Sequence, residues 1–142
     1  MKAETGHLIK KWGKFWVYWF PVAAYMSLIF FLSSRSTLPV NISRIPYGDK
    51  LCHCTEFALL GYHLLRAFFH EESSWLSRHA LLLAIGIAVL FGLSDEFHQI
   101  FIPLRQADVS DLIADFLGAM IGVWVAFGIH RRIDQRQRKG SD

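Results

Sequence analysis

The sequence predicts an all-α membrane protein with four transmembrane helices and both termini in the cytoplasm. Hydrophobic residues make up 53% of the 142 residues and charged residues only 19%. This composition is too apolar for a soluble domain of this size, which needs charge to cover its surface. The apolar runs are also continuous, whereas the strands of a membrane barrel alternate every second residue. The runs approach the roughly twenty residues that a helix needs to cross a bilayer.

The first helix is predicted over residues 15–34. This segment, FWVYWFPVAAYMSLIFFLSS, carries no formal charge, and Pro21 lies near its start, where a missing N–H is tolerated. The run is too long for the apolar core of a signal peptide, and no small-x-small cleavage motif follows it. We therefore expect a permanent span, preceded by a cytoplasmic N-terminal flank over residues 1–14.

Three further helices are predicted over residues 51–69, 79–102 and 111–129, each with polar residues near one end. Each is long enough to span once its polar end is placed at a membrane interface. Residues 15–130 then form a single transmembrane domain. The basic segment RRIDQRQRKGSD, residues 131–142, is expected to be a disordered cytoplasmic tail that is attracted to anionic lipid.

The distribution of Lys and Arg predicts the orientation. Eleven of the fifteen lie in the N-terminal flank, in the connection between the second and third helices, or in the tail. The other four are Arg35, Arg44, Lys50 and Arg105. Because cytoplasmic loops carry the excess of Lys and Arg, both termini are expected in the cytoplasm. The start of the second helix, the end of the third and the start of the fourth then share the extracytoplasmic level.

Carboxylates gather at this level. Seven of the twelve lie in or beside the apolar segments: Asp49, Glu56, Asp95, Glu96, Asp108, Asp111 and Asp115. A charged side chain at the centre of a transmembrane helix costs at least about 2.5–3.5 kcal/mol, and less near the interface. The cluster is therefore the first candidate for a functional site.

Helical spacing predicts that these groups converge. His53 and Glu56 lie three and six residues after Lys50, so the three line roughly one side of the first turns of their helix. On the third helix, the spacing i, i+3, i+4 unites Asp95, His98 and Gln99. On the fourth helix, the spacing i, i+4, i+7, i+11 unites Asp111, Asp115, Gly118 and Gly122. The two glycines form a small-xxx-small pair that lets another helix approach closely, so the acids on that stripe are expected to face protein.

Two segments resemble a known family. DKLCHCTEFALLG at residues 49–61 and SDEFHQIFIPLRQADVSDLIADFLGAMIG at residues 94–122 are similar to the VanZ-like family of small bacterial membrane proteins, whose founder is associated with low-level teicoplanin resistance. The positions that fit the family's pattern are Asp49, Lys50, His53, Glu56, Phe57, Asp95, Glu96, Gln99, Arg105, Asp111, Gly118 and Gly122. Asp115 stands where the family often has Asn, which adds negative charge beside Asp111 unless a proton or a cation compensates it. The resemblance implies a multi-pass protein of the bacterial cytoplasmic membrane, acting in the cell envelope, and it brings no settled reaction.

The polar cluster suggests a site for a lipid-linked or glycopeptide-related substrate at the outer leaflet. The candidate catalytic residues are His53, Glu56, Asp95, Glu96, Gln99, Asp111 and Asp115. The candidate substrate-binding residues are Asp49, Lys50 and Arg105, of which the two cations suit a phosphate. His53 or Glu56 would serve as a general base. A divalent cation such as Mg²⁺ or Ca²⁺ is a candidate cofactor, since carboxylates and histidines can hold one.

Two other interpretations stay open. Buried polar pairs can fix the register of a helix bundle without any chemistry, which is a structural role. Intramembrane acids and histidines are also markers of proton or solute transport. Membrane lipid is the expected partner, and nucleic acid is not, because Lys and Arg gather at the chain ends rather than along one face. The sequence decides neither between an enzyme and a binding protein nor the oligomeric state.

Overall fold

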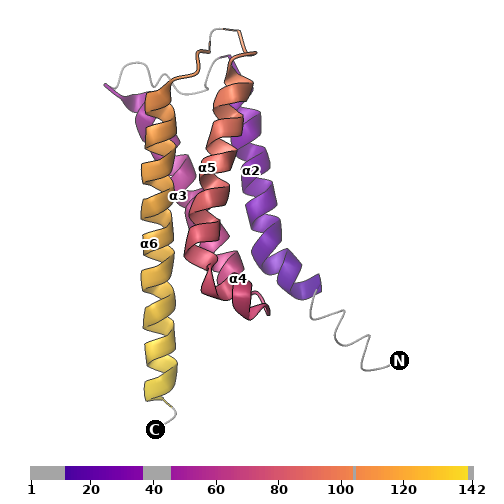
Figure 1. Ribbon diagram of the computed structural model, residues 1–142, viewed down its shortest axis with the longest axis vertical. Helices are drawn as coiled ribbons and strands as arrows, with labels where there is room; N and C mark the ends of the chain where they lie inside the picture. Colours follow the sequence, from indigo (N-terminus) through magenta and orange to yellow (C-terminus); the bar gives the residue numbers. More distant parts are fainter. Residues whose placement is uncertain (1–11, 37–45, 104, 141–142) are drawn as a thin grey trace.

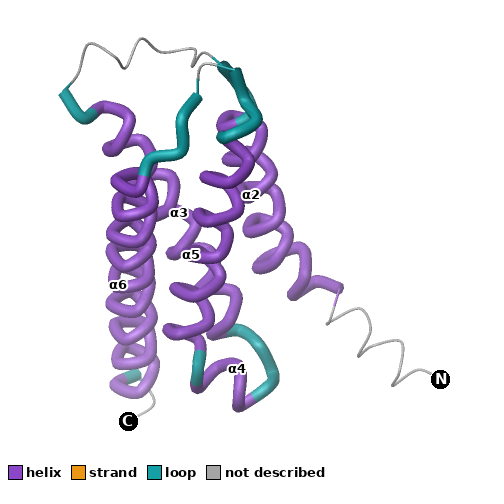
Figure 2. The backbone as a smooth tube through the Cα atoms, turned by 45° about the horizontal axis from the view of Figure 1, so that its top comes forward, coloured by secondary structure: helices purple, strands orange, loops and turns teal. Residues whose placement is uncertain are grey.

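A computed structural model describes residues 12–36, 46–103 and 105–140; residues 1–11 of the predicted flank and 141–142 of the predicted tail lie outside this part. The described part is helical and contains no β-strand (Figures 1 and 2), which confirms the all-α prediction. Its elements are η1 (Phe15–Trp19), α2 (Phe20–Ser33), α3 (Gly48–Phe69), α4 (Ser74–Arg78), α5 (Ala80–Gln99) and α6 (Val109–Lys139).

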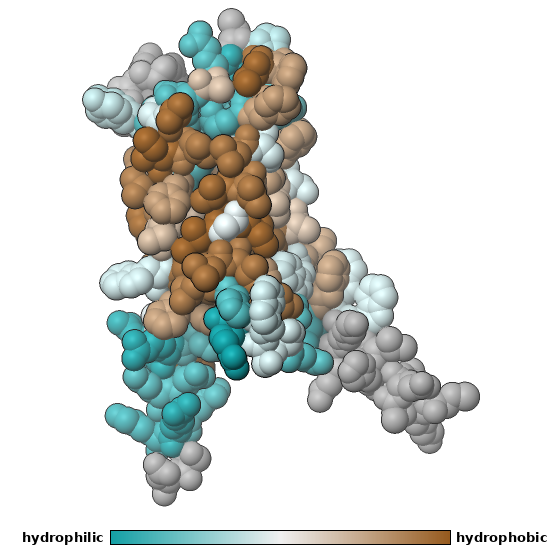
Figure 3. Space-filling model, in the orientation of Figure 1, coloured by the Kyte–Doolittle hydropathy of each residue, from teal (hydrophilic) through white to brown (hydrophobic). Residues whose placement is uncertain are grey.

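Three of the described helices are long and apolar enough to cross a membrane. They are Trp12–Ser33, which includes η1 and α2, Ala80–Gln99 and Val109–Lys139. On the face seen in Figure 3, an apolar middle zone separates two polar ends. α3 has 22 residues, which is sufficient length, but it carries Asp49, Lys50, Glu56 and Arg66 and is not among the three helices with a long, nearly uncharged apolar stretch. The protein is thus a membrane protein with at least three helices of spanning character.

α3 is the central helix of the bundle. It contacts η1, α2, α4, α5 and α6, and its contact with α6 is the most extensive. The start of α3, the end of α5 and the start of α6 lie at one end of the molecule, whereas α4 and the end of α6 lie towards the other (Figure 1). The three polar segments that the sequence assigns to a common level therefore meet.

Glycines on α6 bring its backbone against that of α3. A Cβ added at Gly122 would lie 1.8 Å from the carbonyl oxygen of Ala58, and one at Gly118 would lie 2.1 Å from that of Cys54. No side chain fits at these distances. The close small-xxx-small packing predicted for the two glycines is confirmed, and it sets how near the polar groups of the two helices can come.

α5 packs through a stripe of small residues spaced four apart. Ala80, Ala84, Ala88 and Gly92 are all buried, and the stripe continues into buried Glu96. Because residues four apart share one helix face, the small residues let the whole face approach α3 and α6. The same face therefore carries the polar end of α5 into the bundle.

Two helix boundaries differ from the prediction. The segment expected as one helix over residues 79–102 is preceded by the short α4, where the Ser73 hydroxyl accepts the Leu76 N–H, and α5 begins at Ala80. α6 continues to Lys139, well past residue 129. The expectation of a disordered tail is wrong as far as Lys139, because RRIDQRQRK is rich in helix-favouring Arg, Gln and Lys and contains no Gly or Pro.

Replacing Gly122 with Ala tests the contact between α3 and α6. The added methyl group would overlap the Ala58 carbonyl oxygen, so the helices must separate. We expect the detergent-solubilised protein to lose at least about 2 kcal/mol of unfolding free energy, measured by thermal unfolding. Gly128→Ala is the matched control, because a Cβ there meets nothing within 4 Å and Ala favours a helix over Gly. Equal melting temperatures for the two variants would contradict the close packing.

Candidate functional site

The polar residues converge where α3 begins, α5 ends and α6 begins. Asp95 and Glu96 lie near the end of α5, and Asp111 and Asp115 lie near the start of α6; all four are buried. His53 is buried near the start of α3. Residues from three helices thus meet at the end of the bundle where helical spacing predicts them.

Lys50 joins the start of α3 to the start of α6. Its Nζ lies 2.6 Å from Asp111 Oδ1, 2.8 Å from Asp108 Oδ2 and 3.0 Å from Asp49 Oδ2. Partial burial lowers the pKa of Lys50, but its hydrogen bonds to the three carboxylates outweigh this effect and hold the pKa above its ordinary value. The same ammonium holds the pKa of Asp108 and of Asp49 below the ordinary range. Lys50, Asp49 and Asp108 are therefore charged at neutral pH.

Asp108 connects the helices at this site, although it was not among the predicted site residues. Its Oδ1 accepts the Ser110 N–H at 2.8 Å, which caps α6, and its Oδ2 accepts from Lys50. Its own backbone N–H donates to Glu96 Oε2 at 2.9 Å. Asp108 thus connects all three helices. The signal was in the sequence, because an Asp directly before an apolar helix is a preferred N-cap.

His53 and Asp115 form a buried pair between α3 and α6. His53 Nδ1 lies 3.0 Å from Asp115 Oδ1, and His53 Nε2 lies 4.0 Å from Asp111 Oδ2. The Asp115 side chain is 1% exposed, and its Oδ2 has no hydrogen-bond partner among the described residues. Gly92 on α5 leaves room for that oxygen, since a Cβ there would lie 2.9 Å from it. A carboxylate bonded to one ring nitrogen fixes the orientation of the imidazole.

Gln99 connects the end of α5 to the end of α2. Its Nε2 donates to Asp95 Oδ2 at 3.0 Å and to Ser33 Oγ at 3.2 Å, and all three side chains are buried. Ser33 was not predicted; its place at the polar end of the first apolar run was a weak signal. His98, which the spacing places on one face with Asp95 and Gln99, also lies against the end of α2, with Nε2 3.0 Å from Ser34 Oγ.

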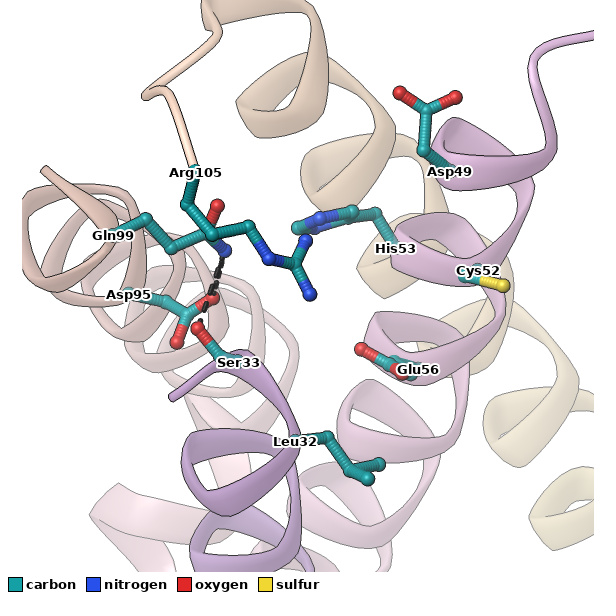
Figure 4. A pocket seen from close by; sticks show the side chains of 9 residues that line it. All are labelled: Leu32, Ser33, Asp49, Cys52, His53, Glu56, Asp95, Gln99 and Arg105. Carbon is teal, nitrogen blue, oxygen red and sulfur yellow. Dashed lines mark hydrogen bonds between the residues drawn. The ribbon is translucent and has the colours of Figure 1, made fainter. Parts of the chain in front are cut away.

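A small pocket lies beside these residues (Figure 4). It has a volume of about 30 Å³ and is lined by Leu32, Ser33, Asp49, Cys52, His53, Glu56, Asp95, Gln99 and Arg105. A cavity of this size holds about one or two water molecules or a small ion. The Arg105 guanidinium points into it, and Glu56 faces it from α3. Arg105 is held by its Nε, which donates to the Arg35 carbonyl oxygen at 3.3 Å.

One group of described residues has the composition and spacing of a metal site. His53, Glu96 and Asp115 each offer one ligand atom, and these atoms lie within 4.8 Å of one another. All three residues are buried. Glu96 also has an oxygen, Oε1, with no hydrogen-bond partner in the described part of the chain.

The ten predicted site residues lie at this end of the bundle, but they fall into separate sets. Lys50 and Asp111 belong to an ion-pair network, which Asp49 shares with the pocket. Glu96 and Asp115 lie beside His53. The pocket is lined by six of the ten: Asp49, His53, Glu56, Asp95, Gln99 and Arg105. Their chemical roles stay predictions.

Comparison with known proteins agrees with the resemblance of the sequence. A protein of Schizosaccharomyces pombe, named "Uncharacterized protein C11E3.10", is 32% identical over 89 residues, which are 62% of this chain and 52% of that protein. The matched segment thus covers about half the length of this curated relative. No solved structure matches the chain. The family model VanZ/LLP1 matches residues 7–130. This chain therefore belongs to the VanZ/LLP1 family.

Proposed function

We propose that the protein crosses the membrane four times, with α3 as the additional span. Its 22 residues correspond to about 33 Å of helix, close to the roughly 30 Å of a hydrocarbon core. Its central position supports this topology, because the other helices surround it and give its charged side chains protein partners. Asp49 and Lys50 then lie at one interface, and Arg66 lies near the other.

The proposed orientation has both termini in the cytoplasm and the polar cluster at the outer face. The N-terminal start of the helix formed by η1 and α2 and the C-terminal end of α6 lie away from the cluster end (Figure 1). The excess of Lys and Arg in the flank and the tail supports a cytoplasmic location for both. The membrane is, in this proposal, the bacterial cytoplasmic membrane, as the family resemblance implies.

The proposed activity is binding of the anionic headgroup of a membrane lipid or lipid-linked envelope substrate at the outer face. The observation that carries it is Arg105, whose guanidinium points into the polar pocket while its Nε is held by the Arg35 backbone. A guanidinium so anchored still offers N–H groups to a phosphate. The pocket is too small for a whole headgroup, so one or two phosphate oxygens would reach in while the rest of the lipid stays at the membrane surface. Lipids that carry a phosphate group are also common to bacterial and yeast membranes.

Lys50 has a different role in this proposal from Arg105. Its three carboxylate partners occupy the donors of its ammonium, so it holds the acids in place and does not meet a substrate. This network also supports the structural alternative, in which the buried polar groups only fix the register of α3 against α6.

Transport is the less favoured alternative. Below the cluster, the buried side chains of α3 and α5 are apolar, including Phe57, Leu60, Leu64, Ala84 and Ala88. The described buried acids are confined to one end, and a continuous polar path towards the opposite end does not follow from them. A proton or solute pathway normally needs ionisable groups along its length.

Thiol labelling tests the topology. In a Cys52→Ser, Cys54→Ser background, we expect Gln106→Cys in the exposed loop before α6 to react with a membrane-impermeant maleimide in intact cells. Gln137→Cys, at the exposed end of α6, should react only after permeabilisation; both positions are exposed in the structure. The reverse pattern would refute the orientation, and reaction of both cysteines from outside would refute a membrane crossing by α6.

Arg105→Gln tests headgroup binding. We expect phosphatidylglycerol retained by the detergent-purified full chain, counted by native mass spectrometry, to fall about tenfold, since a charge-assisted hydrogen bond is worth about 1.5–3 kcal/mol. Arg105→Lys should lose less of the retained phosphatidylglycerol, because lysine keeps the positive charge but lacks the paired N–H donors of the guanidinium. Arg132→Gln, which removes the same charge from the exposed far part of α6, should change retention little. An equal loss in the Arg105→Gln and Arg132→Gln variants would mean that the lipid is held by general basic charge and not by this pocket.

Lys50→Met tests the ion-pair network. The variant leaves buried Asp111 without its cation, and we expect a loss of about 2 kcal/mol of unfolding free energy, less than the about 3–5 kcal/mol for a fully buried pair, because Lys50 is 24% exposed. The double variant with Asp111→Asn should recover part of the loss. If lipid retention survives in Lys50→Met at a temperature where it is folded, Lys50 is structural; if the variant is as stable as the wild type, the network contributes nothing.

The network should also make stability depend on acid pH. Asp49 and Asp108 have lower pKa values when folded, so their contribution is full above the unfolded value of about 4 and is lost as pH falls through the folded pKa values. We expect the melting temperature of the wild type to fall between pH 5 and pH 3 more steeply than that of Lys50→Met. Parallel curves would exclude Lys50 as the cause.

A further inference from the structure

We propose that His53, Glu96 and Asp115 form a binding site for one divalent cation, of the class of Mn²⁺ or Zn²⁺. The three side chains come from α3, α5 and α6, so the ion would join the three central helices. This inference deepens the proposed headgroup binding by naming a cofactor for the same polar end, but it stands on different residues and is measurable without a lipid.

The geometry of the three groups suits an ion. Their ligand atoms lie within 4.8 Å of one another, and a Zn²⁺ ion bonds imidazole nitrogen and carboxylate oxygen at about 2.0–2.2 Å. Ligands at such bond lengths lie roughly 3–4 Å apart around the ion, so small side-chain rotations suffice. His53 and Asp115 are already 3.0 Å apart at Nδ1 and Oδ1, the separation across one shared proton, which an ion would replace.

Two buried oxygens point independently to a missing positive partner. Asp115 is fully buried and its Oδ2 has no hydrogen-bond partner, and Glu96 is 8% exposed and its Oε1 has none within the described part of the chain. A buried carboxylate oxygen without a donor is costly, so native structures usually supply a proton, a water molecule or a cation. Asp95 Oδ1 also lacks a hydrogen-bond partner among the described residues, but the Asp115 and Glu96 oxygens belong to the group whose spacing fits a metal.

The charges around the site have the same implication. Lys50 is already surrounded by Asp49, Asp108 and Asp111, so it does not neutralise Glu96 or Asp115. Glu56 and Asp95 add further negative charge beside His53 at the pocket. A divalent cation would supply two positive charges where Arg105 is the only Lys or Arg among the described residues that line the pocket. It would also let an acidic pocket accept a phosphate, because an anion can then bind the ion directly.

The donor set selects the class of ion. One imidazole nitrogen with two carboxylates suits Zn²⁺ or Mn²⁺, whereas Mg²⁺ and Ca²⁺ favour oxygen ligands throughout. This choice revises the Mg²⁺ or Ca²⁺ that the carboxylates by themselves suggested. Three protein ligands leave at least one coordination position open, and the pocket of about 30 Å³ that His53 also lines has room for the water or phosphate oxygen that would fill it.

Metal binding to the full chain tests the site. Protein purified in detergent and stripped with EDTA would be titrated with Mn²⁺, Zn²⁺ and Mg²⁺ by calorimetry, and bound Mn²⁺ would be examined by electron paramagnetic resonance. We expect one Mn²⁺ or Zn²⁺ per chain, weak Mg²⁺ binding, a melting temperature that rises with Mn²⁺, and coupling of Mn²⁺ to an imidazole nitrogen. Glu96→Gln and Asp115→Asn should each weaken Mn²⁺ binding at least tenfold, and His53→Gln should remove the nitrogen coupling.

The control is Asp134→Asn, which removes a carboxylate from the exposed far part of α6 and should leave the affinity unchanged. Asp115→Asn nearly preserves the shape of the side chain, so its Mn²⁺ affinity provides the test if the Glu96→Gln variant does not fold. Absence of Mn²⁺ and Zn²⁺ binding to the wild type, or unchanged affinity in Asp115→Asn, would overturn the site and leave a shared proton between His53 and Asp115. If Mn²⁺ or Zn²⁺ binds but Arg105→Gln does not lower phosphatidylglycerol retention, only the headgroup proposal is overturned. If Arg105→Gln lowers retention but neither ion binds, only the metal site is overturned.

Discussion

The close approach of α3 and α6 is the constraint on which the polar site depends. Gly118 and Gly122 let the α6 backbone meet that of α3 at distances where no side chain fits. One and two turns away, this approach brings Asp115 to His53 and Asp111 to Lys50. Short polar side chains such as Asp cannot span a wider gap. A bundle held apart by larger residues would therefore leave the same acids buried without partners, which membrane helices do not tolerate.

Electrostatics then divides the polar end into two regions. At the interface, Lys50 neutralises carboxylates that remain partly accessible and ties the helix starts together through Asp108. Deeper in, Glu96 and Asp115 lie beside His53, and each keeps an oxygen that has no donor among the described residues. The first region is satisfied by the protein itself. The second is left to a proton, a water molecule or an ion, which is why the functional proposals concern that region and the adjoining pocket.

Membership of the VanZ/LLP1 family connects this arrangement to a scaffold that also matches part of a yeast protein. Three described helices have spanning character, and the polar site lies at the end of these helices, where a bilayer surface would be. A ligand that reaches such a site is most simply one already held in the membrane. The small pocket volume limits what enters to one or two oxygen atoms of a phosphate or to a small ion, whatever larger molecule carries it.

The sequence by itself determined the class of the protein, the approximate helices and the common level of the carboxylates, because composition, run length and helical period are local properties of the chain. It also identified the Gly118 and Gly122 stripe. It missed the Asp108 link, the contacts of Gln99 and His98 with Ser33 and Ser34 of α2, and the contact of Lys50 with Asp111. Only the tertiary structure decided these points. Which groups meet depends on the separation and rotation of helices distant in sequence, and neither is encoded in any one segment.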